Sequence, residues 1–347
     1  MSKTAVVLFN LGGPDAPEAV EPFLFNLFFD PAIIRVATQL RWLLGKRISK
    51  RRATIAQEIY RQMGGGSPIL PNTEAQAEAV SRLLQEKGLG EFRVFIAMRY
   101  WHPRAAAAAR EVAAYAPDRV ILLPLYPQFS TTTSASSLKE WVEEARKAGI
   151  TAPSRSLCCY PAEPGFVEAV AAGLRHALRQ VDHDRPPKVL FSAHGLPKKI
   201  VEQGDPYQWQ VEQSVAAVLN HFGEVNLDWQ ICYQSRVGPL EWIGPATDEE
   251  IGKAAREGRP IILVPIAFVS EHSETLVELD IEYRELADKA GAPLYIRVPT
   301  VATERPFIDG LAELVAGAMS QEGAICSHAG GRLCPARWSG CPQAGGT

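Results

Sequence analysis

Short apolar runs rich in β-branched residues alternate along this sequence with longer amphipathic stretches, and this alternation limits the folds that the chain can adopt. Eight runs are candidate strands, at about 5–11, 93–99, 119–125, 154–160, 188–193, 227–233, 260–268 and 293–298. Nine stretches have apolar residues at helical spacing, at about 18–28, 73–87, 103–115, 137–148, 165–179, 207–222, 248–257, 274–290 and 305–319. Strands that alternate with helices are typical of parallel sheets joined by crossover helices. The pattern predicts an α/β protein with four strands in each half.

The length of the chain predicts two domains. It has 347 residues, more than the roughly 250–300 residues at which single hydrophobic cores usually split. We therefore expect two similar Rossmann-like domains, each a four-stranded parallel sheet flanked by helices. Turn-forming residues at 161–165 place the boundary there, so that the domains span 1–160 and 161–303. The remaining segment, 304–347, is predicted to be a helix followed by an extension rich in Gly, Cys and Pro.

Composition and motifs exclude several functions and locations. The charged fraction is 22% and the formal net charge is −3, which gives no electrostatic reason to expect nucleic acid as a partner. The glycine-rich stretches 11–14 and 63–68 match no nucleotide-binding motif, so no nucleotide cofactor is expected. Because the sequence has neither a signal peptide nor an apolar run of about 18–20 residues, we expect a cytoplasmic protein.

His194 is the most informative single residue. It follows the apolar run 188–193 and precedes Gly195, Leu196 and Pro197, which predicts an imidazole at a strand end where the backbone turns. In open parallel sheets, ligands bind beyond the carboxyl ends of the strands. A neutral imidazole accepts protons near neutral pH and is a common ligand of divalent metals. A histidine at such a position can also have a structural role, and the residue alone does not decide between the two.

A group of glutamates follows another predicted strand. Glu271 lies in the turn, and Glu274, Glu278 and Glu282 follow at intervals of four, which places the last three along one face of a helix. Like charges at this spacing repel one another, and a solvated helix face would explain them. Apolar neighbours on the same helix favour the alternative, a line of carboxylates that leads a divalent cation to an imidazole.

Several motifs, taken in order, resemble the ferrochelatase family. They lie at 10–14, 63–68, 99–103, 126–130, 190–197 with 204–207, 233–239 with 242–245, and 270–283. They extend over nearly the whole chain, and their collinear order makes the resemblance specific. It implies two chelatase-like domains with a porphyrin cleft between them, and a lyase that inserts ferrous iron, its substrate, into protoporphyrin IX in the last step of haem biosynthesis. The alternatives are a chelatase for coproporphyrin III or cobalt, and a haem-binding module that retains the fold.

The resemblance also assigns roles to residues. It implies that His194 accepts pyrrole protons or coordinates iron and that Glu274 lies on the metal side. With iron as the substrate, Glu271, Glu278 and Glu282 become the candidates for a path along which the ion approaches. The residues that it implies for porphyrin binding are Leu11, Arg61, Tyr100, Tyr126, Ser130 and Trp242. Some relatives carry a second basic residue where this chain has Gln62, which weakens the assignment of Arg61 to a propionate. Bending the macrocycle costs about 1–5 kcal/mol, which binding of the rest of the porphyrin must supply.

The tail is rich in thiols. It contains Cys326, Cys334 and Cys341, and a fourth thiol is available at Cys158 or Cys159. Four thiolates can hold a 2Fe–2S cluster or a zinc ion, and the spacing is not that of a ferredoxin. The resemblance implies a 2Fe–2S cluster held by the three tail cysteines and one remote cysteine, for which we prefer Cys158. The remaining cysteine, at position 232, is expected to be a small buried hydrophobic residue.

One apolar segment lies near the N-terminus. Residues 18–29 contain Phe23, Leu24, Phe25, Leu27, Phe28 and Phe29, more than one face of a helix can bury. Part of this segment is expected in the core. The rest resembles the hydrophobic lip of the cleft and would allow peripheral contact with the inner face of a membrane. The alternative is burial between the domains. The sequence does not fix the oligomeric state, and a homodimer is one of the states left open.

Overall fold

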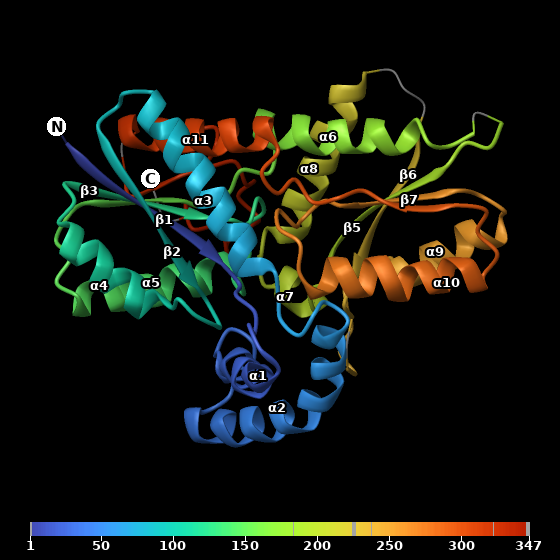
Figure 1. The fold of residues 1–347 in the computed structure, drawn as a ribbon, viewed down its shortest axis with the longest axis horizontal. Coiled ribbons are helices and arrows are strands. Elements are labelled where there is room, and N and C mark those ends of the chain that lie inside the picture. The colour runs from blue at the N-terminus through green and yellow to red at the C-terminus, as the bar shows by residue number, and fades with distance from the viewer. Residues whose placement is uncertain (1, 183, 224–226, 237, 322, 345–347) are drawn as a thin grey trace. The chain divides into compact units, whose positions relative to one another are not determined.

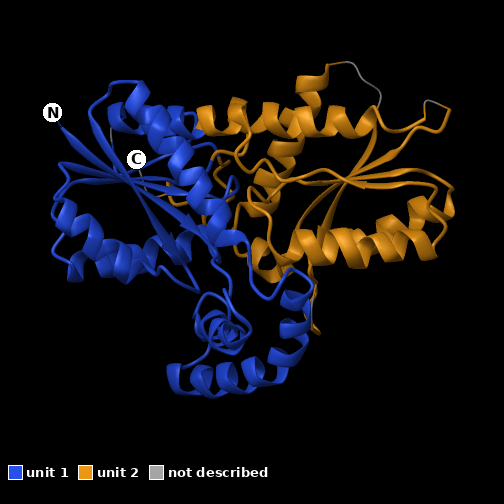
Figure 2. Cartoon of the chain, viewed as in Figure 1, with its two compact units in different colours: residues 1–159, 311–333, 345–347 blue, residues 160–310, 334–344 orange. Residues whose placement is uncertain are grey.

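The computed structural model describes residues 2–182, 184–223, 227–236, 238–321 and 323–344. The chain divides into two compact units, each with its own parallel sheet (Figures 1 and 2). Unit 1 comprises residues 1–159, 311–333 and 345–347, and unit 2 comprises 160–310 and 334–344. The division at 159/160 lies beside the predicted boundary at 160/161. The segment 304–347, predicted as a separate part, is divided between the two units.

The sheet of unit 1 has five parallel strands in the order β2-β1-β3-β4-β9. The strands are β1 (Lys3–Asn10), β2 (Glu91–Met98), β3 (Arg119–Pro124), β4 (Ser154–Leu157) and β9 (Ile325–Cys326). The first four were predicted. The fifth, β9, comes from the tail and exceeds the four strands expected, because a two-residue strand leaves no periodic pattern in a sequence. Strand β1, which lies between β2 and β3, is almost wholly buried, in keeping with its continuous apolar run.

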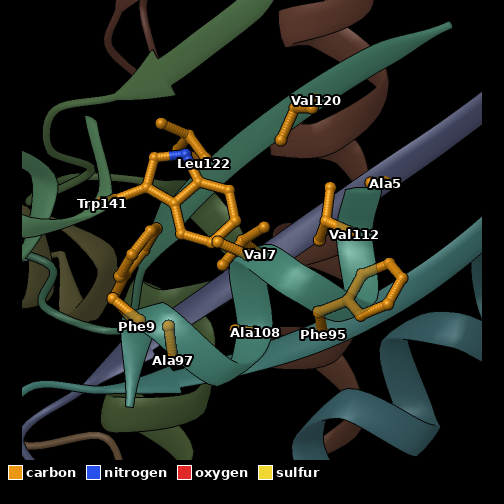
Figure 3. Close-up of a cluster of buried hydrophobic side chains, with 12 residues drawn as sticks. Ala5, Val7, Phe9, Phe95, Ala97, Ala108, Val112, Val120, Leu122 and Trp141 are labelled. Carbon is orange, nitrogen blue, oxygen red and sulfur yellow. The ribbon is translucent and has the colours of Figure 1, made fainter. Parts of the chain in front are cut away.

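Helices α4 and α5 cover one face of this sheet. Trp141 of α5 lies against the sheet near Phe9 of β1, with the ring centroids 5.8 Å apart in an edge-to-face arrangement (Figure 3). Small residues of α4, such as Ala108 and Ala109, allow the helix to approach the strands closely. The helical segments of unit 1 before β4 are a 3-10 turn (Pro17–Ala19), α1 (Val20–Phe29), α2 (Thr38–Arg61), α3 (Ile69–Glu86), α4 (Ala105–Tyr115) and α5 (Ser134–Lys147).

Helix α2 was not predicted, although it is 24 residues long. Charged residues surround most of its circumference, so the sequence lacks the apolar stripe by which a helix is recognised. It packs against α1, the segment with many phenylalanines (Figure 1). Among the described residues, no helix is long and apolar enough to cross a bilayer.

The sheet of unit 2 has four parallel strands, as predicted, and their order is β6-β5-β7-β8. The strands are β5 (Lys188–His194), β6 (Asp228–Gln234), β7 (Ile261–Pro265) and β8 (Tyr295–Arg297). The helices after β4 are α6 (Pro164–Leu178), α7 (Lys198–Glu202), α8 (Tyr207–Phe222), α9 (Thr247–Arg256), a π-helix (Glu274–Glu282), α10 (Tyr283–Lys289) and α11 (Arg305–Ser320). The helix predicted over 274–290 therefore has two parts, and its first part is a π-helix rather than an α-helix.

Candidate active site

The carboxyl ends of three neighbouring strands of unit 2 bring the candidate catalytic residues together. His194 is the last residue of β5 and lies beside Gln234, the last residue of β6, in the register of the sheet. The loop after β7 leads through Ser270 to Glu274, where the π-helix begins. Because parallel strands end at the same edge, the side chains that follow them share one site.

Glu274 lies between two imidazoles. Its Oε2 atom is 4.0 Å from Nδ1 of His194 and 4.0 Å from Nε2 of His272. Among the described residues, neither Glu274 Oε2 nor His194 Nδ1 has a hydrogen-bond partner, although both atoms are buried. The side chain of His194 is 42% exposed, whereas that of His272 is 9% exposed. The arrangement can pass a proton between an accessible imidazole and a carboxylate.

His272 is a functional candidate to which the sequence analysis gave no role. Its Nδ1 lies 3.2 Å from the Ser270 carbonyl oxygen, which can only accept, so Nδ1 carries the proton and Nε2 faces Glu274 with a lone pair. Burial lowers the pKa of His272, and the negative charges of Glu274 and Glu271 oppose this only in part. Its position in the loop after β7 was the signal that could have identified it, because strand-end loops carry ligand-binding side chains.

The glutamates of the π-helix differ in their surroundings. Glu278 is mostly buried and accepts hydrogen bonds from the Ser235 N–H at 2.8 Å, from Gln234 Nε2 at 3.1 Å and from the Tyr283 hydroxyl at 3.0 Å. Burial, followed by the charge of Glu274, raises the pKa of Glu278. Glu282 is exposed.

Glu271 is held by an arginine. Its Oε1 accepts from Arg297 Nη1 at 2.6 Å and from the Thr300 N–H at 2.9 Å. Burial raises the pKa of Glu271, but the charge of Arg297 and the hydrogen bonds outweigh burial, so the pKa is lowered overall. Glu271 is therefore a carboxylate that is paired with a cation beside the site. From the sequence, it was instead expected to line a path for iron.

Two of the residues predicted to bind porphyrin are in the interior of unit 1. Tyr100 is 2% exposed, and its hydroxyl donates to Asp30 Oδ2 at 2.8 Å. Ser130 is 1% exposed, and its hydroxyl lies 2.9 Å from that of Thr132. Tyr126 is half-buried, and burial raises its pKa.

The other three predicted porphyrin-binding residues are more accessible. Leu11 is half-buried and packs against the apolar cluster of α1 and α2. Arg61 ends α2, with its side chain 73% exposed and 2.5 Å from Glu58. Trp242 belongs to unit 2 and packs against Gly195, where an added Cβ would lie 3.2 Å from the indole. Residue 237, part of the motif before Trp242, lies outside the described residues.

A buried ionic cluster anchors Tyr100, and the sequence did not indicate it. Asp30, at the end of α1, accepts from Arg99 Nη2 at 2.8 Å and from the Ser136 hydroxyl at 2.6 Å in addition to Tyr100. Arg99 also pairs with Glu140 at 3.1 Å. The cluster ties the α1–α2 segment to the carboxyl end of β2.

Three cysteines belong to unit 1. The Sγ atoms of Cys158 and Cys159 are 3.2 Å apart. The Cys158 N–H donates to the Cys326 carbonyl at 2.8 Å, between β4 and β9. All three side chains are buried. Burial, followed by the charge of Cys158, raises the pKa of Cys326 to about 11.

Two cysteines of the tail belong to unit 2. Cys334 accepts a hydrogen bond from Gln210 Nε2 at 3.2 Å, and Cys341 is buried. The four predicted cluster ligands are thus shared between the units, two in each. In the described part of the chain, no three His, Cys, Asp or Glu side chains form a group that could hold a metal ion.

The comparisons with known sequences are consistent along the chain. A model of the ferrochelatase family matches residues 3–319. The ferrochelatase of Caulobacter vibrioides (strain NA1000 / CB15N) is 52% identical over 341 residues, covering 98% of this chain and 97% of its own. That of Phenylobacterium zucineum (strain HLK1) is 52% identical over 347 residues, covering 99% of each chain. That of Pelagibacter ubique (strain HTCC1062) is 47% identical over 341 residues, covering 98% of each.

Solved structures resemble the chain in fold. SirB from Bacillus subtilis with Fe3+ has a TM-score of 0.52 at 11% identity, covering 92% of this chain and 96% of its own. The sirohydrochlorin chelatase SirB from Bacillus subtilis subspecies spizizenii in complex with cobalt has the same TM-score at 10% identity, with the same coverage. At these identities the likeness concerns the fold alone. Together with the two parallel sheets, it confirms the predicted α/β class with two Rossmann-like halves.

Proposed function

The chain belongs to the ferrochelatase family, and on this basis we propose that it inserts Fe2+ into protoporphyrin IX at a site formed by His194 and Glu274. The protein is a metal-inserting lyase of haem biosynthesis. The observation that carries the assignment of the site is a single carboxylate oxygen, Glu274 Oε2, 4.0 Å from two imidazoles.

Metal insertion requires that two pyrrole protons leave the porphyrin while Fe2+ approaches its nitrogens. His194 is suited to accept a proton because its imidazole is accessible and its Nδ1 has no hydrogen-bond partner among the described residues. Glu274 provides the neighbouring acceptor and stabilises the imidazolium that forms. Burial lowers the pKa of His272, which favours the neutral imidazole, whose Nε2 keeps a lone pair for the metal side.

We propose that iron reaches this site along Glu282, Glu278 and Glu274. The support is the succession from the exposed Glu282 to the enclosed Glu278 and then to Glu274 beside the imidazoles. Carboxylates in such a succession would replace the water ligands of the ion in steps. We place Glu271 outside this path because Arg297 already neutralises it.

The porphyrin contacts are proposals with different supports. Leu11 and Trp242 offer half-buried apolar surfaces, and Arg61 offers an exposed guanidinium suited to a propionate. Tyr126 is half-buried and can contact the macrocycle at its edge. Tyr100 and Ser130 are interior residues, so we propose that they stabilise the binding surface of unit 1 from within the core and do not contact the porphyrin.

An anaerobic metallation assay tests the proposed substrate. The purified protein is given Fe2+ with protoporphyrin IX in one arm and coproporphyrin III in the other, and the products are identified by their absorption spectra. We expect protohaem to form faster than the coproporphyrin product. The reverse preference would replace the proposed substrate, and the absence of both products would refute the activity.

We also propose that Cys158, Cys326, Cys334 and Cys341 hold a 2Fe–2S cluster. In its favour, all four ligands are buried thiols, the donor type that such clusters use. The neighbouring Cys159 is equally buried, and the choice of Cys158 stays a prediction. The raised pKa of Cys326 means that the thiol ionises only when a cation compensates for burial. The group would supply electron exchange, and no step of metal insertion requires it.

Metal and sulfide analysis decides between the cluster and zinc. The as-isolated protein is expected to absorb in the visible region and to contain two iron atoms and two sulfides, as the composition of a 2Fe–2S cluster requires. Cys326→Ser should remove this absorption. Cys232→Ser is the matched control, since Cys232 is a buried strand thiol whose pKa burial raises to about 12. Zinc without sulfide in the wild-type protein would overturn the cluster.

We propose peripheral contact with the cytoplasmic face of an anionic membrane, through α2 rather than α1. The large apolar side chains of α1 are buried or half-buried, and the hydrophobic lip expected within 18–29 stays a prediction. In contrast, Leu40, Trp42 and Leu43 of α2 are 49%, 43% and 58% exposed. The basic residues that follow in α2 are Lys46, Arg47, Lys50, Arg51 and Arg52. Exposed apolar side chains beside cations are typical of helices that lie on anionic bilayers.

A further inference from the structure

Arg297 joins two carboxylates that lie on either side of Glu274 in the sequence. It ends β8, and its side chain is 8% exposed. Nη1 donates to Glu271 Oε1 at 2.6 Å, and Nε donates to Asp280 Oδ1 at 2.8 Å. Nη2 donates to the other oxygen of Asp280, so this contact is bidentate. One buried cation therefore connects the loop before the π-helix with the body of that helix.

The strand β8 supplies a second anchor to the π-helix. The hydroxyl of Tyr295 donates to the Leu279 carbonyl at 2.7 Å. A π-helix is rare and usually occurs as a short segment at a functional site, so its wide turn needs support from its neighbours. Arg297 and Tyr295 give this support from one strand, and Glu274 is the first residue of the helix that they hold.

The contacts of the carboxylates around the imidazoles differ. Glu271 is paired with Arg297, and Glu278 accepts hydrogen bonds from Ser235, Gln234 and Tyr283. Oε2 of Glu274 has no hydrogen-bond partner among the described residues, and it faces both imidazoles at 4.0 Å. The pairing of the neighbouring carboxylates thus leaves this oxygen available.

We propose that Arg297 is a positioning residue for iron insertion, which holds the loop and the π-helix together so that Glu274 presents its free oxygen to His194 and His272. The inference rests on the proposed roles of His194 and Glu274. Arg297 touches neither the iron nor the porphyrin. Its effect on the reaction comes from the placement of Glu274, in which an error of about 1 Å can cost a hundredfold in rate.

Three variants test this role. Arg297→Lys keeps the charge but loses the planar fork that reaches two carboxylates. Arg297→Met removes the charge and leaves two carboxylates without their cation, which can prevent folding. The triple variant Arg297→Met, Glu271→Gln, Asp280→Asn removes all three charges together and thereby avoids this penalty. The matched control is Arg284→Lys, because Arg284 Nη1 donates to the Tyr295 carbonyl at 3.0 Å on the same strand.

Steady-state kinetics with Fe2+ and porphyrin, together with melting temperatures, give the readouts. We expect kcat to fall about tenfold in Arg297→Lys and at least as much in the triple variant, while KM for the porphyrin stays within twofold of the wild type. The melting temperature of the triple variant should recover relative to Arg297→Met without recovery of kcat. Arg284→Lys should match the wild type in every value.

A purely structural role gives a different result. In that case kcat follows the melting temperature across the series, and a triple variant that regains stability also regains kcat, which would overturn the proposal. Wild-type kcat in Arg297→Lys would overturn it as well. If the single variants do not fold, the kcat of the triple variant decides. A wild-type protein that fails to metallate porphyrin refutes the proposed function instead, so the two failures are distinguishable.

Discussion

Oε2 of Glu274 and Nδ1 of His194 lie 4.0 Å apart, with neither atom hydrogen-bonded to a described residue. Buried polar atoms without partners are uncommon in folded proteins, because each costs about 1–3 kcal/mol. A site that keeps two such atoms facing each other gains when a proton or a cation enters between them. We therefore expect the two residues to act as one unit.

The first prediction is that His194→Ala and Glu274→Gln each lower kcat by at least a hundredfold. Each variant removes one partner from the pair that we propose to accept protons and face the metal, and general acid–base groups contribute about 10²–10⁴ in rate. Porphyrin binding should persist in both variants, as measured by quenching of porphyrin fluorescence. The kcat of the double variant should be little lower than that of either single variant, since the effects of substituting residues that act together are not additive.

The control for this series is His221→Ala, because His221 pairs with Glu168 at 2.8 Å on α8 and α6, outside the site. Its kcat should equal that of the wild type. Turnover within tenfold of the wild type in His194→Ala would remove His194 from its proposed role.

The placement of His194 could be predicted from the sequence, whereas the support of Glu274 could not. An apolar run that ends in a histidine and a turn indicates a strand end, and strand β5 ends at His194. In contrast, the apolar spacing over 274–290 does not distinguish an α-helix from the nine-residue π-helix found there. The contacts of Arg297 depend on β8 lying beside β7, and no local pattern encodes that neighbourhood. The roles of the porphyrin-binding residues came from the family resemblance and stay predictions.

The second prediction concerns the buried cluster of Asp30. Burial raises the pKa of this carboxyl, but the hydrogen bonds from Ser136 and Ala32 and the charge of Arg99 outweigh burial, so the pKa is lowered. A lowered carboxyl pKa stabilises the folded state above the pKa of the unfolded chain, near 3.8, and this stabilisation is lost as the pH falls through the folded value. Asp30→Asn should therefore lower the free energy of unfolding by about 3–5 kcal/mol at neutral pH, as for other broken buried pairs.

Urea denaturation at several pH values measures this effect. The difference in the free energy of unfolding between wild type and Asp30→Asn should shrink as the pH falls below about 4, because protonation of Asp30 then removes the same charge from the wild type. Glu58→Gln breaks only an exposed pair with Arg61 and should leave the denaturation midpoint unchanged. A difference that is constant with pH would show that the Asp30 charge does not contribute.

The third prediction concerns membrane contact. Replacing Trp42 and Leu43 by alanine should lower the partition of the protein onto phosphatidylglycerol vesicles by about tenfold or more, since burying one such side chain is worth about 1.5–3 kcal/mol. Wild-type binding should also weaken at high salt, because the basic residues of α2 are then screened. Co-sedimentation with vesicles measures both effects.

The matched control is Ile55→Ala, because Ile55 is 68% exposed on the same helix but lies about 18 Å along its axis from Leu43. Its partition should be close to that of the wild type. If the Trp42 and Leu43 variant binds vesicles as tightly as the wild type does, α2 is not the membrane-binding element.

The fourth prediction concerns the contact between the tail and the loop after α7. Gly204 has a φ of +98°, its carbonyl accepts from the Gly340 N–H at 2.9 Å, and an added Cβ would lie 2.3 Å from Ser339 Oγ. Gly204→Ala should therefore release the tail segment 334–344 from this loop. Gly258→Ala is the matched control, because Gly258 also has a positive φ, +69°, but an added Cβ there meets nothing within 4 Å.

Both substitutions impose the cost of a positive φ on alanine, so their difference isolates the contact with Ser339. We expect trypsin to cleave after Arg337 faster in Gly204→Ala than in Gly258→Ala. The melting temperature of Gly204→Ala should also be lower, because overpacking costs about 1–3 kcal/mol of stability. Equal cleavage rates would mean that the tail does not depend on this contact. The cluster absorption of the two variants then tells whether docking of Cys334 and Cys341 on unit 2 is needed to hold the proposed iron–sulfur group.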